Sequence, residues 1–254
     1  MKISSVRCLS GNVLKIIAAI CMVIDHMGIL FFPTVIACRY IGRLAYPIFA
    51  FMIAEGAKYT KNKLKYLGMI SGLALICQLV YYFAMDDLYM CILVTFSLSI
   101  VTIYALQYLK KCLFASERNA RDIALSMTLF VLTVVMVYVA NMYLEIDYGF
   151  YGCMAPVFVS LFDFRGIDAP EQLKKLDNHY VRLAMLGIGV LAIWFPTETK
   201  QDILFALFSL SALIPLFFYS EKRGKVNMKY FFYIFYPLHL VALQGIQFLI
   251  NNKG

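Results

Sequence analysis

Long runs of apolar residues constrain this chain more than any other feature of its sequence. A helix needs about 20 mostly apolar residues to cross a bilayer, with a usual range of about 17–25. About nine stretches approach that length and leave only loops between them. The predicted spans are residues 13–32, 35–57, 64–84, 88–109, 123–143, 149–164, 180–195, 203–219 and 230–250.

The composition agrees with spans that face lipid. Hydrophobic residues make up 62% of the chain and charged residues 15%, against about 45–50% and about 25% in a typical soluble protein. We therefore predict an all-α polytopic integral membrane protein, with residues 1–254 as a single transmembrane helical domain of a cytoplasmic membrane. The sixth and seventh runs are short, so one of them could be re-entrant. Because no small-residue cleavage site follows the first run, we expect it to be a retained helix rather than a signal peptide.

Loop charges predict the orientation of these spans. Loops with Asp86 and Asp87, with Glu145 and Asp147, and with Glu198, Lys200 and Asp202 alternate with basic loops. Because basic loops stay in the cytoplasm, the N-terminus is predicted to be cytoplasmic and the C-terminus extracytoplasmic. The same rule explains the net charge of +8 without a nucleic-acid partner. The basic loops hold Lys58, Lys61, Lys63 and Lys65, then Lys110, Lys111, Arg118 and Arg121, then Lys174, Lys175 and Arg182, then Lys222, Arg223, Lys225 and Lys229.

The cysteines point to no redox or metal chemistry. The chain has seven of them, scattered and without a C-x-x-C pair. Most lie in or beside apolar runs, where a free cysteine behaves as a small hydrophobic residue. We predict neither disulfides nor a metal site.

The first two runs carry five ionisable residues inside them or at their edges: Asp25, His26, Arg39, Arg43 and Glu55. An ionisable group in the middle of a spanning helix costs roughly 2.5–3.5 kcal/mol on insertion scales. Such groups indicate function by default, and five in two adjacent helices exceed what packing requires. These two runs are therefore the predicted site.

Asp25 and His26 form the centre of this predicted site. An imidazole beside a carboxylate in a dry environment is typical of a general base or a nucleophile. Adjacent residues of a helix do not face each other, so Asp25 is expected to pair with a group on another helix. Alternatively, His26 only hydrogen-bonds to another helix.

The second run adds Arg39 and Arg43, one helical turn apart and on the same face as Tyr46. Pro47 lacks a backbone N–H and clashes with the carbonyl of Arg43, which predicts a kink at that depth. Arg39 could instead extend its side chain to the outer interface. At the inner end of the run, Glu55 could form an ion pair with Lys58.

The last run contains a second histidine near its middle. Tyr236 and His239 flank Pro237, which frees the carbonyl of Tyr233. The run has the same orientation as the first, so His239 is predicted at the depth of His26 and could pair with it. The third histidine, His179, is predicted to lie at the membrane interface.

Several motifs resemble the TraX family. They are LK…DH.G in the first run, R..GRLA.PIFAF…EG..YT.N..KY in the second run and its loop, DYG..G at 147–152, KRG at 222–224 and KYFFYIFYPLHL at 229–240. They follow one another in chain order over almost the whole sequence. TraX-like proteins are polytopic membrane proteins, and the namesake is linked to N-terminal acetylation of conjugative pilin.

The family is also similar to a wider group of transmembrane acyltransferases that modify sugars, with a catalytic histidine in the first helix and cytosolic acetyl-CoA as donor. The resemblance implies acetyl transfer to a cell-surface glycan or a pilin-like protein amine at the outer face, without a metal. His26 matches the catalytic histidine, with Asp25 balancing charge and Arg43 stabilising the oxyanion. We predict that Arg39, Tyr46, Tyr236 and His239 bind substrate at the reaction chamber, and that Glu55, Lys58 and Tyr59 do so at the mouth where CoA phosphates would enter.

Two other functions stay open. In a proton-coupled transporter or exporter, Asp25, His26 and His239 would form a relay. In an accessory assembly protein, Asp25 and His26 would matter only for stability. No internal repeat of the kind common in transporters is visible.

Overall fold

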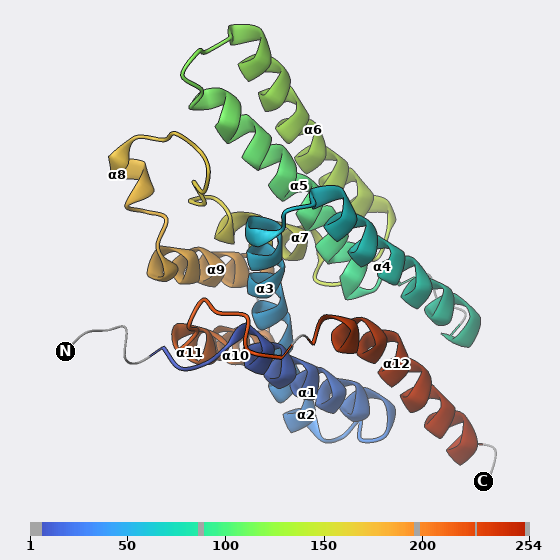
Figure 1. Ribbon diagram of the computed structural model, residues 1–254. Helices are drawn as coiled ribbons and strands as arrows, with labels where there is room; N and C mark the ends of the chain where they lie inside the picture. The colour runs from blue at the N-terminus through green and yellow to red at the C-terminus, as the bar shows by residue number, and fades with distance from the viewer. Residues whose placement is uncertain (1–6, 86–88, 196–198, 227, 252–254) are drawn as a thin grey trace. The chain divides into compact units, whose positions relative to one another are not determined.

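The structure is a computed structural model that describes residues 7–85, 89–195, 199–226 and 228–251. Asp86, Asp87 and Glu198, which we used to predict orientation, lie outside the described residues. The described residues form helices, loops and two isolated bridges, with no strand among them. The helices are α1 (Gly11–Leu30), α2 (Ile36–Gly42), α3 (Ala45–Tyr59), α4 (Lys63–Met85), α5 (Ile92–Leu113), α6 (Ala120–Tyr143), α7 (Gly149–Val159), α8 (Glu171–Lys174), α9 (His179–Trp194), α10 (Lys200–Ser211), α11 (Leu213–Phe217) and α12 (Lys229–Asn251) (Figure 1).

Within the described part of the chain, seven helical segments are long and apolar enough to cross a membrane. Two of them are interrupted helices, formed by α2 with α3 and by α10 with α11. The predicted sixth and seventh spans correspond to the shorter apolar helices α7 and α9. The prediction of an all-helical, multi-pass membrane protein is thus confirmed, while the predicted count of about nine crossings and the orientation stay predictions.

The chain divides into two compact units. The first comprises Met1–Met52, Leu79–Asp87 and Trp194–Gly254, and the second comprises Ile53–Gln78 and Leu88–Ile193. The long helices α3 and α4 each contribute to both units. The prediction of a single domain stays a prediction, and each unit is described by itself below.

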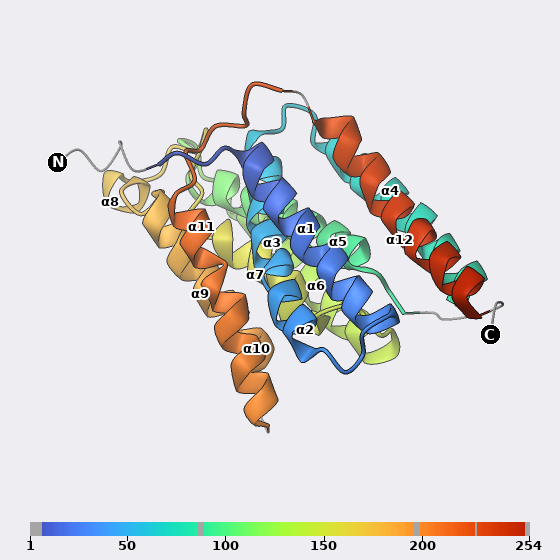
Figure 2. The ribbon, with the colours of Figure 1, turned by 90° about the horizontal axis from the view of Figure 1, so that it is seen from below.

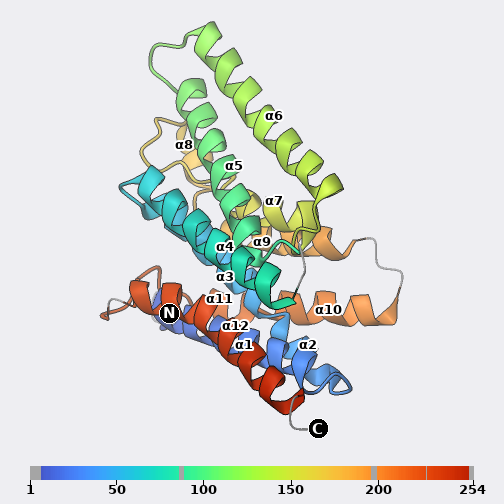
Figure 3. The same cartoon turned by 90° about the vertical axis from the view of Figure 1, so that its right-hand side faces the viewer.

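In the first unit, α2 folds back along α1 (Figure 2), and α12 lies beside α1 (Figure 3). The start of α1 is held in two ways. Ser10 accepts a hydrogen bond from the Val13 N–H through its side chain, and the carbonyls of Lys222 and Arg223 accept the N–H groups of Gly11 and Asn12. These bonds satisfy donors that a helix N-terminus leaves without an intrahelical acceptor.

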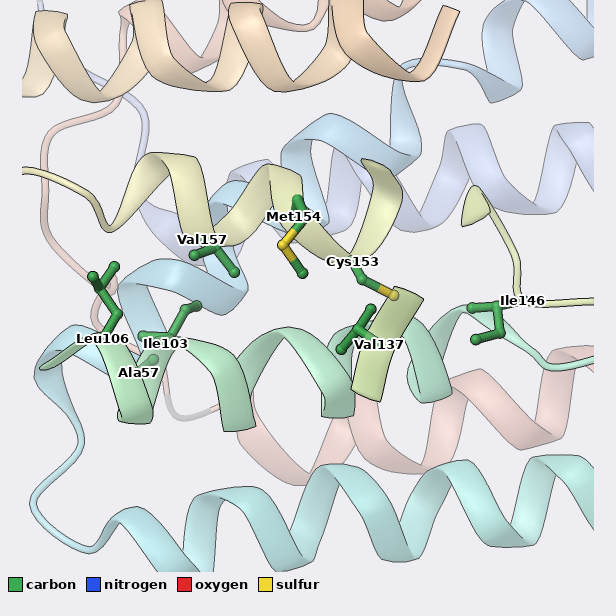
Figure 4. Packing of buried hydrophobic residues seen from close by; sticks show 8 residues of the cluster. All are labelled: Ala57, Ile103, Leu106, Val137, Ile146, Cys153, Met154 and Val157. Atoms are coloured by element: carbon green, nitrogen blue, oxygen red, sulfur yellow. The ribbon is translucent and has the colours of Figure 1, made fainter. Parts of the chain in front are cut away.

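In the second unit, α5 and α6 form an antiparallel hairpin (Figure 1), and α7 packs against α5. Side chains from α3, α5, α6 and α7 and from the loop before α7 fill the space between these helices (Figure 4). Hydroxyl groups add hydrogen bonds between the segments. Ser99 donates to the Cys153 carbonyl and Thr95 donates to the Asp147 carbonyl, each at a distance of 2.8 Å. Close packing and such bonds hold helices together in lipid. The buried hydrophobic side chains that Figure 4 shows between these helices are Ala57, Ile103, Leu106, Val137, Ile146, Cys153, Met154 and Val157.

Candidate functional site

The first unit brings two histidines of distant helices into direct contact. Nδ1 of His26 on α1 lies 3.0 Å from Nε2 of His239 on α12. The two rings are nearly parallel, 9° apart, with centres separated by 5.1 Å. Lys15, also on α1, lies over the ring of Phe232 on α12, 5.8 Å from its centre. Helix α1 therefore meets α12, and the predicted pairing of the two histidines is confirmed.

Asp25, the neighbour of His26, pairs with both arginines of α2. Its Oδ2 lies 2.7 Å from Nη1 of Arg39, and its Oδ1 lies 3.8 Å from Nη2 of Arg43. The expectation that Asp25 pairs with another helix is confirmed. The side chain of Arg39 is 29% exposed, and its guanidinium is held by Asp25. Its guanidinium is thus engaged at the site, which disfavours the alternative that it only extends to the interface.

A break in the second apolar run sets the position of Arg43. Helix α2 ends at Gly42 and α3 begins at Ala45, so Arg43 lies in the turn between them. Pro47 is then the third residue of α3, where its missing N–H costs no intrahelical bond. The predicted kink is therefore a helix break at Arg43, directly beside the ion-paired group.

Aromatic rings cover the guanidinium of Arg43. Its Cζ lies 4.8 Å from the ring centre of Phe205 and 5.8 Å from that of Trp194. Tyr40, one turn before the break, stacks on Phe208 with ring centres 4.8 Å apart. These rings favour a cation at this position. Arg43 is 9% exposed, so it is a buried group of the site.

The closeness of α1 and α2 depends on glycines that we did not predict as part of the site. A Cβ on Gly42 would overlap the side chain of Asp25, and a Cβ on Gly28 would lie 2.5 Å from that of Cys38. Glycine lets two backbones approach where no side chain fits. Gly42 precedes Arg43 in the GRLA motif, a signal that could have identified it as a residue that makes room for Asp25.

We expect Gly42→Ala to disturb the site and the fold together. The new methyl group would displace Asp25 from Arg39, and overpacking of this kind typically costs about 1–3 kcal/mol. The measurement is the midpoint of thermal unfolding of the detergent-purified protein. Gly72→Ala is the matched control, because a Cβ there meets nothing within 4 Å. Equal midpoints for the two variants would contradict the close approach of α1 and α2.

Two of the predicted tyrosines lie in the same unit. Tyr236 is 8% exposed and its ring meets that of His239 edge-on, with centres 5.3 Å apart. It therefore contacts one histidine of the pair, and its role in a reaction chamber stays a prediction. Tyr46 is 3% exposed near the start of α3, and its role in binding a substrate stays a prediction.

The other three predicted residues lie in the second unit. Glu55 pairs with Arg182 at 2.5 Å, and Lys58 pairs with Asp177 at 2.7 Å and with Asp163 at 3.4 Å. The expectation that Glu55 pairs with Lys58 is wrong, because each of them meets a partner from the segment around α8 and α9 instead. Tyr59 is 47% exposed.

The segment from the end of α7 into α9 supplies these partners, a role that we did not predict from the sequence. Lys110 donates to the carbonyls of Ser160 and Asp163, at 2.7 and 3.0 Å. We predicted it only as part of a basic loop, but it belongs to helix α5. His179 is 2% exposed at the start of α9, so it is buried within the protein, and its predicted position at the membrane interface stays a prediction. These buried polar groups anchor the loop to α3 and α5.

Among the described residues, no group of three or more His, Cys, Asp or Glu side chains converges as metal ligands do. The histidine pair with its carboxylate and two guanidinium groups suits proton transfer and the stabilisation of a negative charge. The ion pairs at this centre set two positive charges against one negative charge. An anion that forms beside these guanidinium groups would therefore meet an attractive potential.

The helices and this centre define a class: a multi-pass membrane protein with histidine, carboxylate and guanidinium groups gathered between its helices. The family model described as TraX protein matches residues 10–247. The chain therefore belongs to the TraX family, which is linked to pilin assembly and acetylation.

One curated relative carries the name "Probable fimbrial assembly protein FimC, serogroup H1" and comes from Dichelobacter nodosus. It is 26% identical over 243 residues, which cover 91% of this chain and 92% of the relative. No solved structure matches the chain.

Proposed function

We propose that the protein is an acyltransferase that moves an acetyl group from cytosolic acetyl-CoA to an acceptor at the outer face of the cytoplasmic membrane. The contact between His26 and His239, beside the ion pairs of Asp25, is the observation that carries this proposal. Membership of a family associated with pilin acetylation supports it. His26 acts as the general base or as a transient carrier of the acetyl group.

In the general-base form, the proposed step begins at the acceptor. Nε2 of His26 takes the proton of an acceptor hydroxyl or amine while the acceptor's oxygen or nitrogen bonds to the thioester carbonyl carbon. The tetrahedral intermediate collapses with cleavage of the C–S bond, and His26 returns the proton to the CoA thiolate. In the carrier form, Nε2 attacks the thioester first and the acetyl group then passes to the acceptor, whose proton ends on the thiolate.

The guanidinium groups stabilise the oxyanion in this proposal. Arg43 and Arg39 share Asp25, which fixes both cations around the residue that precedes His26 before the reaction begins. Preorganised donors of this kind are usually the largest electrostatic contribution to acyl transfer. Asp25 orients the arginines and balances part of their charge.

The donor is proposed to enter from the cytosolic side, where CoA phosphates would meet basic loops. Lys58 is already paired with Asp163 and Asp177, so a phosphate would have to compete with two carboxylates there. Lys61 and Lys65 are exposed in the same region and offer cations to a phosphate more readily. Glu55, Lys58 and Tyr59 stay proposed contacts of the donor.

The acceptor is proposed to be a pilin-like protein amine or a cell-surface glycan. The fimbrial name of the relative favours the protein acceptor. A hydroxyl and an amine place the same demand on the site, which is removal of one proton as the new bond forms.

A proton-coupled transporter is the second candidate, because two histidines in direct contact can also pass a proton. The described contacts of Asp25 are with Arg39 and Arg43. They do not connect the carboxylate to the histidines, so the described proton path comprises only His26 and His239. This arrangement favours acyl transfer over a relay of three groups.

Membranes that contain the protein provide the test. They would be given acetyl-CoA labelled in the acetyl group, and both the released CoA thiol and the label in protein and glycan fractions would be measured. We expect thiol release above that of membranes without the protein, with label in one fraction. Absence of both would contradict the proposal, and transport of protons without thiol release would support the second candidate.

A further inference from the structure

Three groups on α1 and α12 form an unbroken hydrogen-bonded chain. The carbonyl oxygen of Phe235 lies 3.1 Å from Nδ1 of His239. Nε2 of His239 in turn lies 3.0 Å from Nδ1 of His26. Both nitrogens of His239 are thus engaged, whereas the contacts within this chain use only one nitrogen of His26.

The carbonyl at one end determines where the protons lie. A carbonyl oxygen only accepts, so Nδ1 of His239 carries the proton and donates it to Phe235. In a neutral imidazole the other nitrogen is then an acceptor. Nε2 of His239 therefore accepts a hydrogen bond, and Nδ1 of His26 must donate it. This leaves the lone pair of His26 on Nε2.

A charged His239 would reverse this assignment, but its surroundings disfavour the charge. The residue is 7% exposed and its ring stacks on Phe235, with centres 5.3 Å apart and planes 11° apart. Burial of an imidazolium in such a place is costly without a counter-ion. The carboxylate of Asp25 is already shared by two arginines.

We propose that His239 is a positioning residue that holds His26 in the Nδ1–H tautomer, so that Nε2 presents its lone pair to the reaction. The use of that lone pair rests on the proposed acyl transfer, whereas the tautomer itself follows from the geometry alone. Phe235 and Tyr236 fix the ring of His239 by stacking and by edge contact. The partner of one ring nitrogen thereby sets the state of the other.

The tautomer can be measured without any activity assay. The protein would be labelled with ¹⁵N-histidine and its ring nitrogens observed by NMR in nanodiscs. The chain has three histidines, so the His179→Gln and His239→Gln variants assign the signals. We expect His26 to be protonated on Nδ1 and unprotonated on Nε2. A proton on Nε2 of His26, with or without one on Nδ1, would overturn the proposal.

Two variants of His239 then test its role. In His239→Gln the side-chain oxygen can replace Nε2 as the acceptor, and we expect His26 to keep its tautomer and activity to fall less than about tenfold. In His239→Leu the acceptor is lost, so His26 should shift toward the Nε2–H form. We expect kcat to fall about 10²-fold or more, as it does when a catalytic histidine loses its orienting partner, with little change in the KM for acetyl-CoA.

The two readouts separate this proposal from the proposed function. If the wild-type protein shows the expected tautomer but no acetyl transfer, the proposed function fails and the positioning role stands. If it transfers acetyl groups while His239→Leu and His239→Gln are equally active, His239 does not position His26. If both variants lose activity equally while the NMR signals of His26 stay unchanged, His239 acts by another route and the proposal is also overturned.

Discussion

Replacement of His26 by alanine should lower the rate of acetyl transfer by about 10²–10⁴-fold, the range that general acid–base catalysis contributes. The imidazole is the base or the acyl carrier of the proposed step, and its loss leaves binding of the donor largely intact. The steady-state kinetics of thiol release from acetyl-CoA would show the change in kcat, with a KM that changes little.

Met27→Leu serves as the matched control for His26→Ala. Met27 is the next residue of α1 and is partly buried, and exchange of methionine for leucine keeps the side-chain volume. We expect this variant to act like the wild type. A His26→Ala variant that is as active as Met27→Leu would show that the histidine takes no part in the reaction.

The largest effect on stability is expected from Arg182→Met in the second unit. The side chains of Arg182 and Glu55 are 2% and 7% exposed, so the substitution removes a guanidinium from a buried carboxylate. Removal of one partner of a buried ion pair costs about 3–5 kcal/mol. The double variant Arg182→Met/Glu55→Leu should recover much of that loss, because it also removes the buried charge.

Heating a background variant that retains only Cys77 and Cys153 with a thiol-reactive dye would measure this loss, because both thiols are buried and belong to the second unit. The control is Lys174→Met. The side chain of Lys174 is 37% exposed, and the two carboxylates that pair with it are each 81% exposed. Exposed pairs contribute about 0–1 kcal/mol. If Lys174→Met lowers the midpoint as much as Arg182→Met does, the buried pair has no special weight.

The sequence was sufficient to predict the membrane-spanning helices, because an apolar run of bilayer length can cross lipid in few structures other than a helix. It also predicted that His26 and His239 would pair, since both lie near the middle of spans and few other polar groups are available there. Asp25 was predictable in kind, as a carboxylate that needs a partner on another helix. Spacing alone did not say which arginine it would meet, and the structure shows both.

The remaining features of the site depend on how closely two helices approach each other and on how loops fold, and neither leaves a periodic pattern in the sequence. Gly42 matters because α1 and α2 touch at Asp25, which no pattern within one helix reveals. The ion pairs of Glu55 and Lys58 join helix α3 to residues more than 100 positions away. Local spacing suggested that the two would pair with each other, and long-range packing provided better partners.

The most direct test uses sealed inverted membrane vesicles, whose cytoplasmic face points outward. Acetyl-CoA with a labelled acetyl group, which does not cross the membrane, would be added outside vesicles that enclose acceptors. The account predicts label bound to an enclosed acceptor with the wild-type protein, and about 10²-fold less or lower with His26→Ala. Equal label in the two preparations, or label only outside the vesicles, would contradict acetyl transfer across the membrane by His26.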